Sequence, residues 1–481
     1  MRKSILAIAV TAALLPGCSL LQTTHERPEP LVPASWSSVE EARQASEAGE
    51  RWWTLFKDPV LDQLVDEALQ HNHDVAVAAA RILEAEATLG ITEADRYPVV
   101  TANGAGSRTG ISEVTATPMF AGMQRQQNNA RVTVNASYEL DVWGKFRRAS
   151  DAARAQLMAA QASRDTVRLT LTADVAQQYF NLLAADAQVA VIRDVLKSRE
   201  EALALLNVRL KAGVGSEYDI RQAEAEVAAA RAQLSGALKG QENLESVLAI
   251  LLGRSPREVM EGKMARGSVA AMEALWVPDG LPSEMLLRRP DIREAEQNLL
   301  AADARIDAAR AEYFPAISLT GYLGFESATL AKLFTSPAGI FQFALGLAQP
   351  IFNAKRLDFN VKGTEARRAQ ALANYQKAIA NAFGDVRNAL NAQVAGRDML
   401  KAESARVTAL LETQRLANVR YEGGVSSRLE VLDADRQVLQ AKLASIDAEN
   451  AQRAAVVSLF KALGGGWTQP SEGSEAQVSA Q

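Results

Sequence analysis

The chain has 481 residues, of which 48% are hydrophobic and 23% are charged, and its formal net charge is -5. This balance is typical of a folded protein, and the lack of a dense Lys and Arg run argues against nucleic acid as a partner. The three histidines and the single cysteine show no metal-ligand spacing, and no phosphate-binding loop is present, so we predict neither an enzyme nor a bound cofactor.

The chain begins with a predicted export signal, residues 1–17. Two basic residues precede the apolar stretch Ile5 to Leu15, and small residues follow before Cys18. The motif LPGCS resembles a bacterial lipoprotein signal, so we predict cleavage before Cys18 and attachment of lipid to it. Ser19 at the next position resembles an outer-membrane destination. The competing interpretation is a chance cysteine inside a discarded signal, since a single cysteine forms no disulfide within the chain.

The remainder of the chain is predicted to be a duplicated half. Asp74 and Asp291 lie in stretches that align without a gap at an offset of 291 − 74 = 217. Further along, residues 209–227 align with residues 420–438 at an offset of 420 − 209 = 211. Each half then has the order helix, strand, strand, long helix, short turn, helix. No apolar run after the signal reaches about 18 residues, so any membrane crossing is expected to use strands.

Each half contains two predicted strands before its long helix. In the first half, residues 99–108 carry a weak pattern, whereas residues 131–142 alternate strictly between apolar and polar side chains. The apolar set of that stretch is Val132, Val134, Ala136, Tyr138, Leu140 and Val142. The apolar sets of the second half are Ile317, Leu319, Leu323 and Phe325, then Phe341, Phe343, Leu345 and Leu347. Loop-like links are predicted at 109–130 and 326–340.

These strands are long enough to cross an outer membrane with apolar side chains toward lipid and polar ones toward a lumen. Four strands are too few to close a membrane barrel, whose smallest examples have about eight, and an open sheet edge in lipid leaves backbone groups unpaired. We therefore expect the barrel to be shared between copies, either two or three. The competing interpretation is an ordinary amphipathic sheet on a soluble core.

The predicted helices are unusually long. No Gly or Pro interrupts residues 145–212, which would span about 100 Å as a helix. Residues 355–422 match them in the second half without a proline, although Gly363, Gly384 and Gly396 weaken the helical pattern. Opposite each long helix lie two shorter ones, predicted at 59–95 and 217–252, then at 284–313 and 428–463. A solitary helical rod is the competing interpretation, and the strands argue against it.

Sharp helical hairpins are predicted where each long helix meets the next helix. A glycine stands just past the end of each long helix, as is common at helix C-termini. Ser216 with Asp219, and Ser427 with Glu430, match the pattern of a hydroxyl cap with an acidic partner three residues later. We therefore expect side-chain caps on both returning helices.

The sequence resembles the TolC-like outer-membrane efflux proteins, most closely the lipidated OprM type. The resemblance covers residues 51–465 and is carried, in family order, by RWWTLFKDPVLDQLVDEAL, RRPDIREAEQNLLAADARIDAARAEYFP, QPIFNAKR and YEGGVSSRLEVLDADRQ. It implies a mainly α fold in a homotrimer, with four strands per copy in a shared twelve-stranded outer-membrane barrel and long antiparallel helices in a periplasmic α-barrel. It also implies passive exit of drugs and other small molecules, delivered by an inner-membrane RND-type transporter through a periplasmic adaptor.

The same resemblance implies a periplasmic gate near the second helical hairpin, at Tyr421, Leu429, Asp433 and Arg436, with Glu430 beside them. Glu430 and Asp433 are three residues apart on a predicted helix, so a threefold ring would bring six carboxylates together at a constriction. The competing interpretation is a helix cap at Glu430 and a surface pair between Asp433 and Arg436.

The first helical hairpin carries Arg209 and Asp219 at the corresponding place, and we expect them to lie at its tip. His71 and His73 could suggest a metal site. Positions two apart do not share a helix face, so we predict ordinary surface histidines instead.

The first part of the predicted division is a signal peptide at 1–17, a lipidated N-terminal segment at 18–58, first-repeat helices at 59–96, the first β-hairpin at 97–142, and a long helix and helical hairpin at 143–253. The second part is a linker and equatorial segment at 254–283, a second-repeat helix at 284–313, the second β-hairpin at 314–352, a second long helix and helical hairpin at 353–465, and a disordered tail at 466–481.

Two other functions stay open at this point. One is a lipid-anchored periplasmic coiled-coil scaffold without a pore, and the other is an outer-membrane channel for protein secretion.

Overall fold

The computed structural model of the chain describes residues 51–112, 114, 124–267 and 289–465. The predicted signal peptide, Cys18 and the predicted tail lie outside these residues. The chain divides into two compact units that are interleaved along the sequence. The strand unit contains Arg81–Gln161 and Glu294–Tyr375, and the hairpin unit contains the described parts of Pro30–Ala80, Ala162–Arg293 and Gln376–Gln481.

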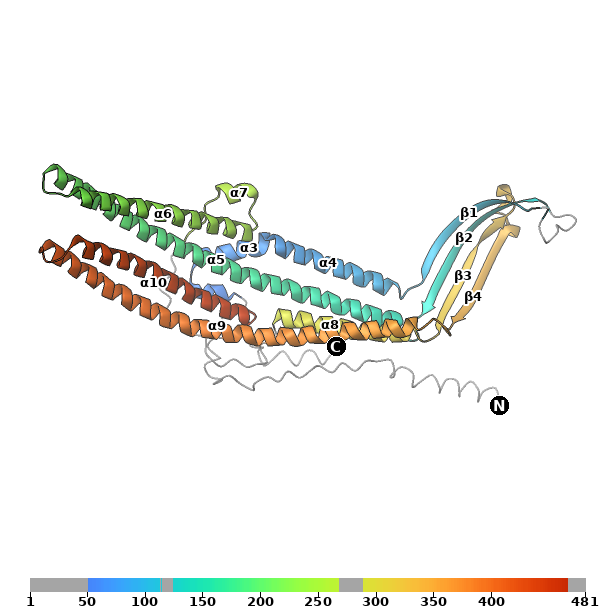
Figure 1. Ribbon diagram of the computed structural model, residues 1–481. Helices are drawn as coiled ribbons and strands as arrows, with labels where there is room; N and C mark the ends of the chain where they lie inside the picture. Colours follow the sequence, from blue (N-terminus) through green and yellow to red (C-terminus); the bar gives the residue numbers. More distant parts are fainter. Residues whose placement is uncertain (1–50, 113, 115–123, 268–288, 466–481) are drawn as a thin grey trace. The chain divides into compact units, whose positions relative to one another are not determined.

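Three described helices of the first half have partners of equal length in the second half (Figure 1). The first half has α3 (Pro59–His71), α4 (His73–Ala94), α5 (Lys145–Lys211), α6 (Glu217–Leu251) and the short α7 (Pro256–Glu261); the second has α8 (Pro290–Ala311), α9 (Arg356–Glu422) and α10 (Arg428–Ala462). The long helices α5 and α9 both have 67 residues, α6 and α10 both have 35, and α4 and α8 both have 22. These equal lengths confirm the predicted internal repeat.

Local sequence explains where the first helices begin and break. Asp58 precedes α3, and its carboxylate accepts hydrogen bonds from the backbone N–H groups of Val60 and Leu61, while Pro59 occupies the first helical position. Extended backbone at Asn72 divides the helical stretch predicted at 59–95 into α3 and α4. The break places the Asn72 side chain at the start of α4.

The largest hydrophobic core of the described residues lies in the hairpin unit. Trp52, in a short 3-10 helix (Trp52–Phe56), stacks on Phe460 of α10 with ring centroids 5.3 Å apart, and Phe56 contacts Phe180 of α5 at 4.7 Å. Leu248 of α6 is also fully buried in this core. Burying large aromatic rings contributes about 1.5–3 kcal/mol each. The core therefore joins the long helices of this unit to the chain before α3.

The strand unit contains one four-stranded sheet. Its strands are β1 (Val99–Gly110), β2 (Gln126–Leu140), β3 (Ala316–Ser327) and β4 (Gly339–Ala348), and each neighbouring pair is antiparallel in the order β1-β2-β3-β4. Figure 1 shows the strands side by side in a curved sheet. The predicted mainly α fold with four strands in two hairpins is thereby confirmed.

Two strand predictions need correction. The links between strands are shorter than predicted, because β1 extends to Gly110 and β3 to Ser327. Val142 does not belong to β2, which ends at Leu140. The reason is local: the carboxylate of Asp141 accepts hydrogen bonds from the backbone N–H groups of Phe146 and Arg147 at the start of α5, at 3.1 and 2.8 Å.

Candidate functional site

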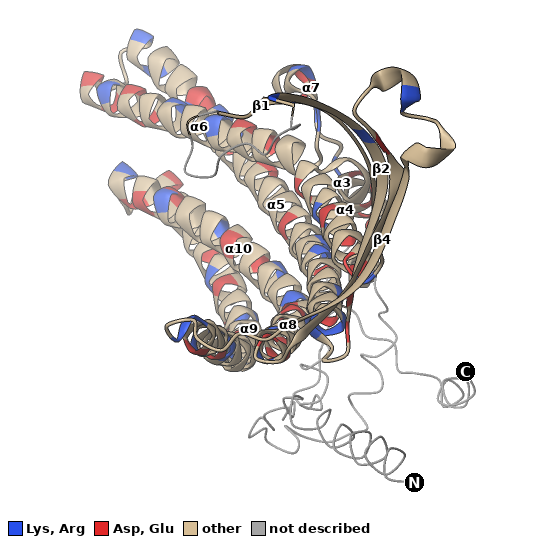
Figure 2. Cartoon of the chain, turned by 90° about the vertical axis from the view of Figure 1, so that its right-hand side faces the viewer, with Lys and Arg blue, Asp and Glu red and all other residues tan. Residues whose placement is uncertain are grey.

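One face of the sheet carries large apolar side chains that remain exposed. The register aligns Val134 of β2 with Leu323 of β3, and Leu323 with Phe341 of β4, and their exposed fractions are 42%, 60% and 77%. Other exposed members of this apolar sheet face are Val132, Leu319, Phe343, Leu345 and Leu347. Figure 2 shows the strands mainly in tan, whereas charged residues are spread along the helices. Contiguous exposed apolar surface of this kind marks a membrane or interaction surface.

The opposite face of the sheet carries polar and charged groups that contact one another. Asn129 of β2 donates a hydrogen bond to the Glu326 carboxylate of β3 at 2.8 Å. Arg131 lies between the same carboxylate, 3.9 Å away, and the Tyr322 ring, whose centroid is 4.6 Å from the guanidinium carbon. Polar and apolar side chains therefore lie on opposite faces, as the alternation predicts for a sheet between lipid and water.

The two outer strands have one partner each. Among the described residues β1 pairs only with β2, and β4 pairs only with β3. An edge strand presents unpaired backbone N–H and C=O groups, and these groups cannot remain unpaired in a hydrocarbon environment. The combination of an exposed apolar face and two open edges therefore requires further strands if this sheet lies in a membrane.

The second-repeat tip connects α9 to α10 and contains the five predicted gate residues. Gly424 adopts a positive φ of 72°, and the backbone N–H of Val425 donates to the carbonyl of Arg420 at 2.9 Å, which closes the turn. Arg428 lies over the Tyr421 ring at 5.6 Å, while Leu429 is 61% exposed.

The charged gate residues lie on the first turns of α10. Arg436 contacts the Asp433 carboxylate at 3.4 Å, and Gln437 donates to the other oxygen of Asp433 at 2.6 Å. Glu430 is exposed in the first turn. The structure thus brings the Asp433–Arg436 pair together on an exposed helix surface, and a ring of carboxylates would need further copies of the chain.

The first-repeat tip connects α5 to α6 and carries different side chains. Arg209 is exposed near the end of α5, and its carbonyl accepts from the backbone N–H of Val214 at 3.0 Å. Asp219 is half-buried in the first turn of α6. At the repeat offset of 211, Asp433 and Arg436 correspond to Gln222 and Ala225. The Asp433–Arg436 pair is therefore specific to the second repeat, whereas Glu430 corresponds to the acidic Asp219.

The predicted serine caps are wrong in their hydrogen bonding. Ser216 and Ser427 do stand at the N-cap positions, but neither side chain accepts a hydrogen bond there. At the second tip the backbone N–H of Glu430 donates instead to the carbonyl of Ser427 at 3.2 Å. The amide that the serine hydroxyl would have satisfied is thus already paired.

Two side chains that sequence reasoning missed each connect the start of one helix to the end of another. Asn72 donates from Nδ2 to the carbonyl of Leu251, the last residue of α6, at 2.8 Å. Arg289 donates from Nη1 to the carbonyl of Ala462, the last residue of α10, at 2.7 Å. These pairs are related by the repeat offsets, since 289 − 72 = 217 and 462 − 251 = 211. Each repeat therefore contains one helix joint closed by one side chain.

The signal for these joints was present in the sequence. Asp74 and Asp291 align in the two repeats, and Asn72 and Arg289 precede each of them by two residues. Their partners at the far ends of α6 and α10 lie 179 and 173 residues away along the chain. Only the folded structure identifies those partners.

No helix among the described residues is long and apolar enough to cross a membrane. Within the same part of the chain, no group of three or more His, Cys, Asp or Glu side chains could hold a metal ion. His71 and His73 are both exposed.

Solved structures of the same fold define the class of protein. The outer-membrane channel CmeC of Campylobacter jejuni superimposes with a TM-score of 0.88 at 27% identity, covering 95% of this chain and 97% of that one. A CusC structure matches with a TM-score of 0.82 at 32% identity, covering 93% and 100%. The fold and the amphipathic sheet are thus those of a TolC-like outer-membrane channel.

Sequence comparison identifies the family. The model of the outer membrane efflux proteins matches residues 64–254 and 281–465. The cation efflux system protein CusC of Escherichia coli O6:H1 is 33% identical over 95% of this chain and 98% of its own length. The probable efflux pump outer membrane protein TtgC of Pseudomonas putida is 34% identical over 100% and 99%. The chain belongs to the outer membrane efflux protein family, and it is a transport conduit of the outer membrane rather than an enzyme.

Proposed function

We propose that three copies of this chain assemble into a homotrimer whose sheets close one twelve-stranded barrel in the outer membrane. The observation that carries this proposal is the apolar sheet face together with the open edges of β1 and β4. Pairing β4 of one copy with β1 of the next would satisfy both edges, since closure alone removes the edges of a sheet. The exposed apolar side chains would then face lipid.

The assembled channel would serve as the outer-membrane component of a tripartite pump. Its partners would be a periplasmic adaptor and an inner-membrane RND-type transporter, with the helical hairpins on the periplasmic side. Relatives are named for cation, toluene and antibiotic efflux. Because these names span different chemical classes, we propose that the transporter selects the cargo and that the channel lets it pass.

The second-repeat tip would act as the gate of the channel. A trimer would place three copies of Asp433, Arg436 and Leu429 around one axis, with Tyr421 and Glu430 beside them. Carboxylates crowded at a constriction favour cations and repel one another, whereas the Arg436 contacts would hold them together. Arg209 and Asp219 at the first-repeat tip would have a supporting role.

The amino terminus would be anchored by lipid on Cys18. Mass spectrometry of the mature amino-terminal peptide provides the test, since diacylation and N-acylation add known masses. A mature protein that starts elsewhere, or carries an unmodified Cys18, would remove the anchor from the proposal.

The decisive experiment reconstitutes the purified full-length protein into planar bilayers. We expect heat-resistant trimers in the outer-membrane fraction and discrete single-channel currents. Silent bilayers from well-formed protein would favour the periplasmic scaffold. Deletion in the native host should sensitise cells to several antibiotics, whereas an unchanged susceptibility panel together with a missing extracellular protein would favour secretion.

A further inference from the structure

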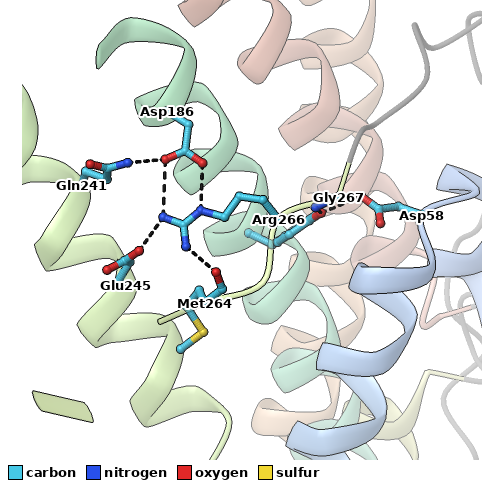
Figure 3. A network of polar contacts seen from close by, with 8 residues as sticks. Asp58, Asp186, Gln241, Glu245, Met264, Arg266 and Gly267 are labelled. Atoms are coloured by element: carbon cyan, nitrogen blue, oxygen red, sulfur yellow. Dashed lines mark hydrogen bonds and ion pairs between the residues drawn. The ribbon is translucent and has the colours of Figure 1, made fainter. Parts of the chain in front are cut away.

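A short segment after α7, residues 264–267, joins α5 and α6 through one guanidinium group (Figure 3). Nε and Nη2 of Arg266 donate to the Asp186 carboxylate of α5 at 2.9 and 3.4 Å, and the same Nη2 donates to Glu245 of α6. Nη1 donates to the Met264 carbonyl at 2.6 Å, and Gln241 of α6 donates to Asp186. Two carboxylates from different helices therefore share one cation.

The next residue of this segment is fixed by a second set of contacts. The backbone N–H of Gly267 donates to the Tyr179 hydroxyl of α5 at 2.9 Å, and that hydroxyl donates to the Asp58 carboxylate at 2.6 Å. Asp58 is completely buried, and a Cβ added at Gly267 would lie 2.3 Å from its Oδ1. Burial, followed by the hydrogen bond to Asp58, raises the pKa of Tyr179, so the phenol stays protonated and continues to donate.

The second repeat has no equivalent of this arrangement at the matching positions. At the offset of 211, Asp186 corresponds to Arg397 and Glu245 to Val456, so the pair of carboxylates is absent there. Instead, Gly396 of α9 faces the α10 backbone, where an added Cβ would lie 3.3 Å from the Gln452 Cα. At this level the two hairpins are thus held by different means: shared charge in the first, close backbone approach in the second.

We propose that residues 264–267 form a strap that fixes α6 to α5, and that Arg266 is the positioning residue of this strap. The strap holds closed the end of the α5–α6 hairpin that lies away from the tip, so we expect this end to stay closed when the channel opens, while Arg199 with Glu226 and Arg231 with Glu200 join the two helices nearer the tip. The functional part of this inference depends on the channel function proposed above. The packing part depends only on the contacts of the strap.

The physical reason lies in the charges that the strap neutralises. Without the Arg266 guanidinium, the carboxylates of Asp186 and Glu245 face each other across the two helices with one amide, Gln241, beside them. Like charges at this separation repel, and a partly buried carboxylate without its cation is destabilising. The end of α6 is then expected to open from α5.

Hydrogen exchange on the full-length trimer tests the strap directly. In Arg266→Gln we expect amides of α6 residues 241–251 to exchange about tenfold faster, with residues 452–462 of α10 unchanged. Arg266→Lys keeps the charge but loses the planar guanidinium that donates to both carboxylates at once. Its α6 exchange rate should lie between those of wild type and Arg266→Gln. The double variant Arg266→Gln/Glu245→Gln removes the repulsion and should return exchange to within about threefold of wild type.

Arg254→Gln is the matched control, because Arg254 makes a comparable two-point contact with Glu67 of α3 but none with α5. Wild-type exchange in α6 of Arg266→Gln would overturn the strap. Should that variant fail to form trimers, unchanged α6 exchange in Arg266→Lys would overturn it equally. Bilayer currents separate the two proposals: a silent wild type removes the channel function, whereas a conducting wild type with identical openings in Arg266→Gln removes the positioning role.

Discussion

The two helix joints of the hairpin unit share one backbone design but use different chemistry. In the first, Asn72 donates to the end of α6, and its amide oxygen accepts from the backbone N–H groups of Asp74 and Val75 at 2.7 and 3.2 Å. In the second, Arg289 donates to the end of α10 and also pairs with Asp291 at 2.8 Å and with Asp385 of α9 at 3.0 Å. The Asn72 side chain contacts the start of α4 and the end of α6, whereas Arg289 also pairs with the long helix α9.

The backbone geometry of the two joints is therefore more similar between the repeats than their side chains are. The second residue after the end of α6 and of α10 is a glycine with positive φ, Gly253 at 72° and Gly464 at 88°. The side chain that closes the joint has changed from Asn72 to Arg289, and the residue whose carbonyl accepts has changed from Leu251 to Ala462. We therefore expect the two repeats to respond differently to mutation in the hairpin unit and alike in the sheet.

The largest effect is expected in the sheet, where the repeats should behave alike. Val134→Arg in the first repeat and Leu319→Arg in the second both place a charge on the apolar sheet face, at a cost of about 2–4 kcal/mol in mid-membrane. We expect both to abolish heat-resistant trimers in the outer-membrane fraction. Gln342→Arg, on the opposite face, should assemble. Normal assembly of both apolar-face variants would contradict a lipid-facing sheet.

The next largest effect should come from the charged joint. Arg289→Ala leaves Asp291 and Asp385 without their shared cation, and we expect a loss of about 2–3 kcal/mol, discounted because Asp385 is half exposed. The thermal midpoint of the detergent-solubilised trimer measures this loss. Exposed Arg293, on the first turn of α8 just after Arg289, is the control, since Arg293→Ala should cost under about 0.5 kcal/mol. Equal midpoints for both variants would refute the role of Arg289.

Mutation of the neutral joint should cost less stability than mutation of the charged joint. The capping and donor contributions of Asn72 can also be measured separately. Asn72→Ala removes both the cap of α4 and the donor to α6, at about 1–2 kcal/mol. Asn72→Asp keeps the capping oxygen and loses only the donor to the Leu251 carbonyl, so it separates the two contributions. A thermal midpoint that falls further for Asn72→Ala than for Arg289→Ala would show that the neutral joint is the stronger of the two.

The smallest effect on stability is expected at the tips, where function should change instead. Asp433→Asn breaks an exposed contact and should leave the thermal midpoint unchanged. It removes charge from the proposed gate, and we expect a several-fold change in cation preference measured by reversal potentials. Gln222→Asn, at the matching first-repeat position, is the control and should leave the reversal potential at the wild-type value. Identical potentials in all three proteins would place the gate elsewhere.

Most of the fold was predictable from the hydrophobic periodicity and the internal repeat of the sequence. The strict alternation in β2 and the absence of Gly and Pro in α5 depend on local sequence, which is why the sheet and the long helices were predictable. Contacts between distant residues were not predictable in this way. The Arg289 carboxylate partner Asp385 is 96 residues away, and Arg266 meets Asp186 across 80 residues.

The candidate gate shows the same limit. Its residues were assigned by resemblance, and the structure adds only their local contacts, because the proposed ring requires neighbouring copies. Local rules also failed where backbone groups satisfied one another first. At Ser427 the pattern of a hydroxyl cap was correct, yet the backbone carbonyl took the hydrogen bond.

The equal lengths of the paired helices restrict which insertions this protein can accept in evolution. One residue added to α9 alone would advance everything beyond it by about 1.5 Å and turn it by about 100°. Leu429 and Asp433 would then point in new directions, and the joint at Ala462 would lose its alignment with Arg289. An insertion is tolerable only when α9 and α10 lengthen by the same amount. The length of these hairpins can therefore change in evolution only through paired insertions.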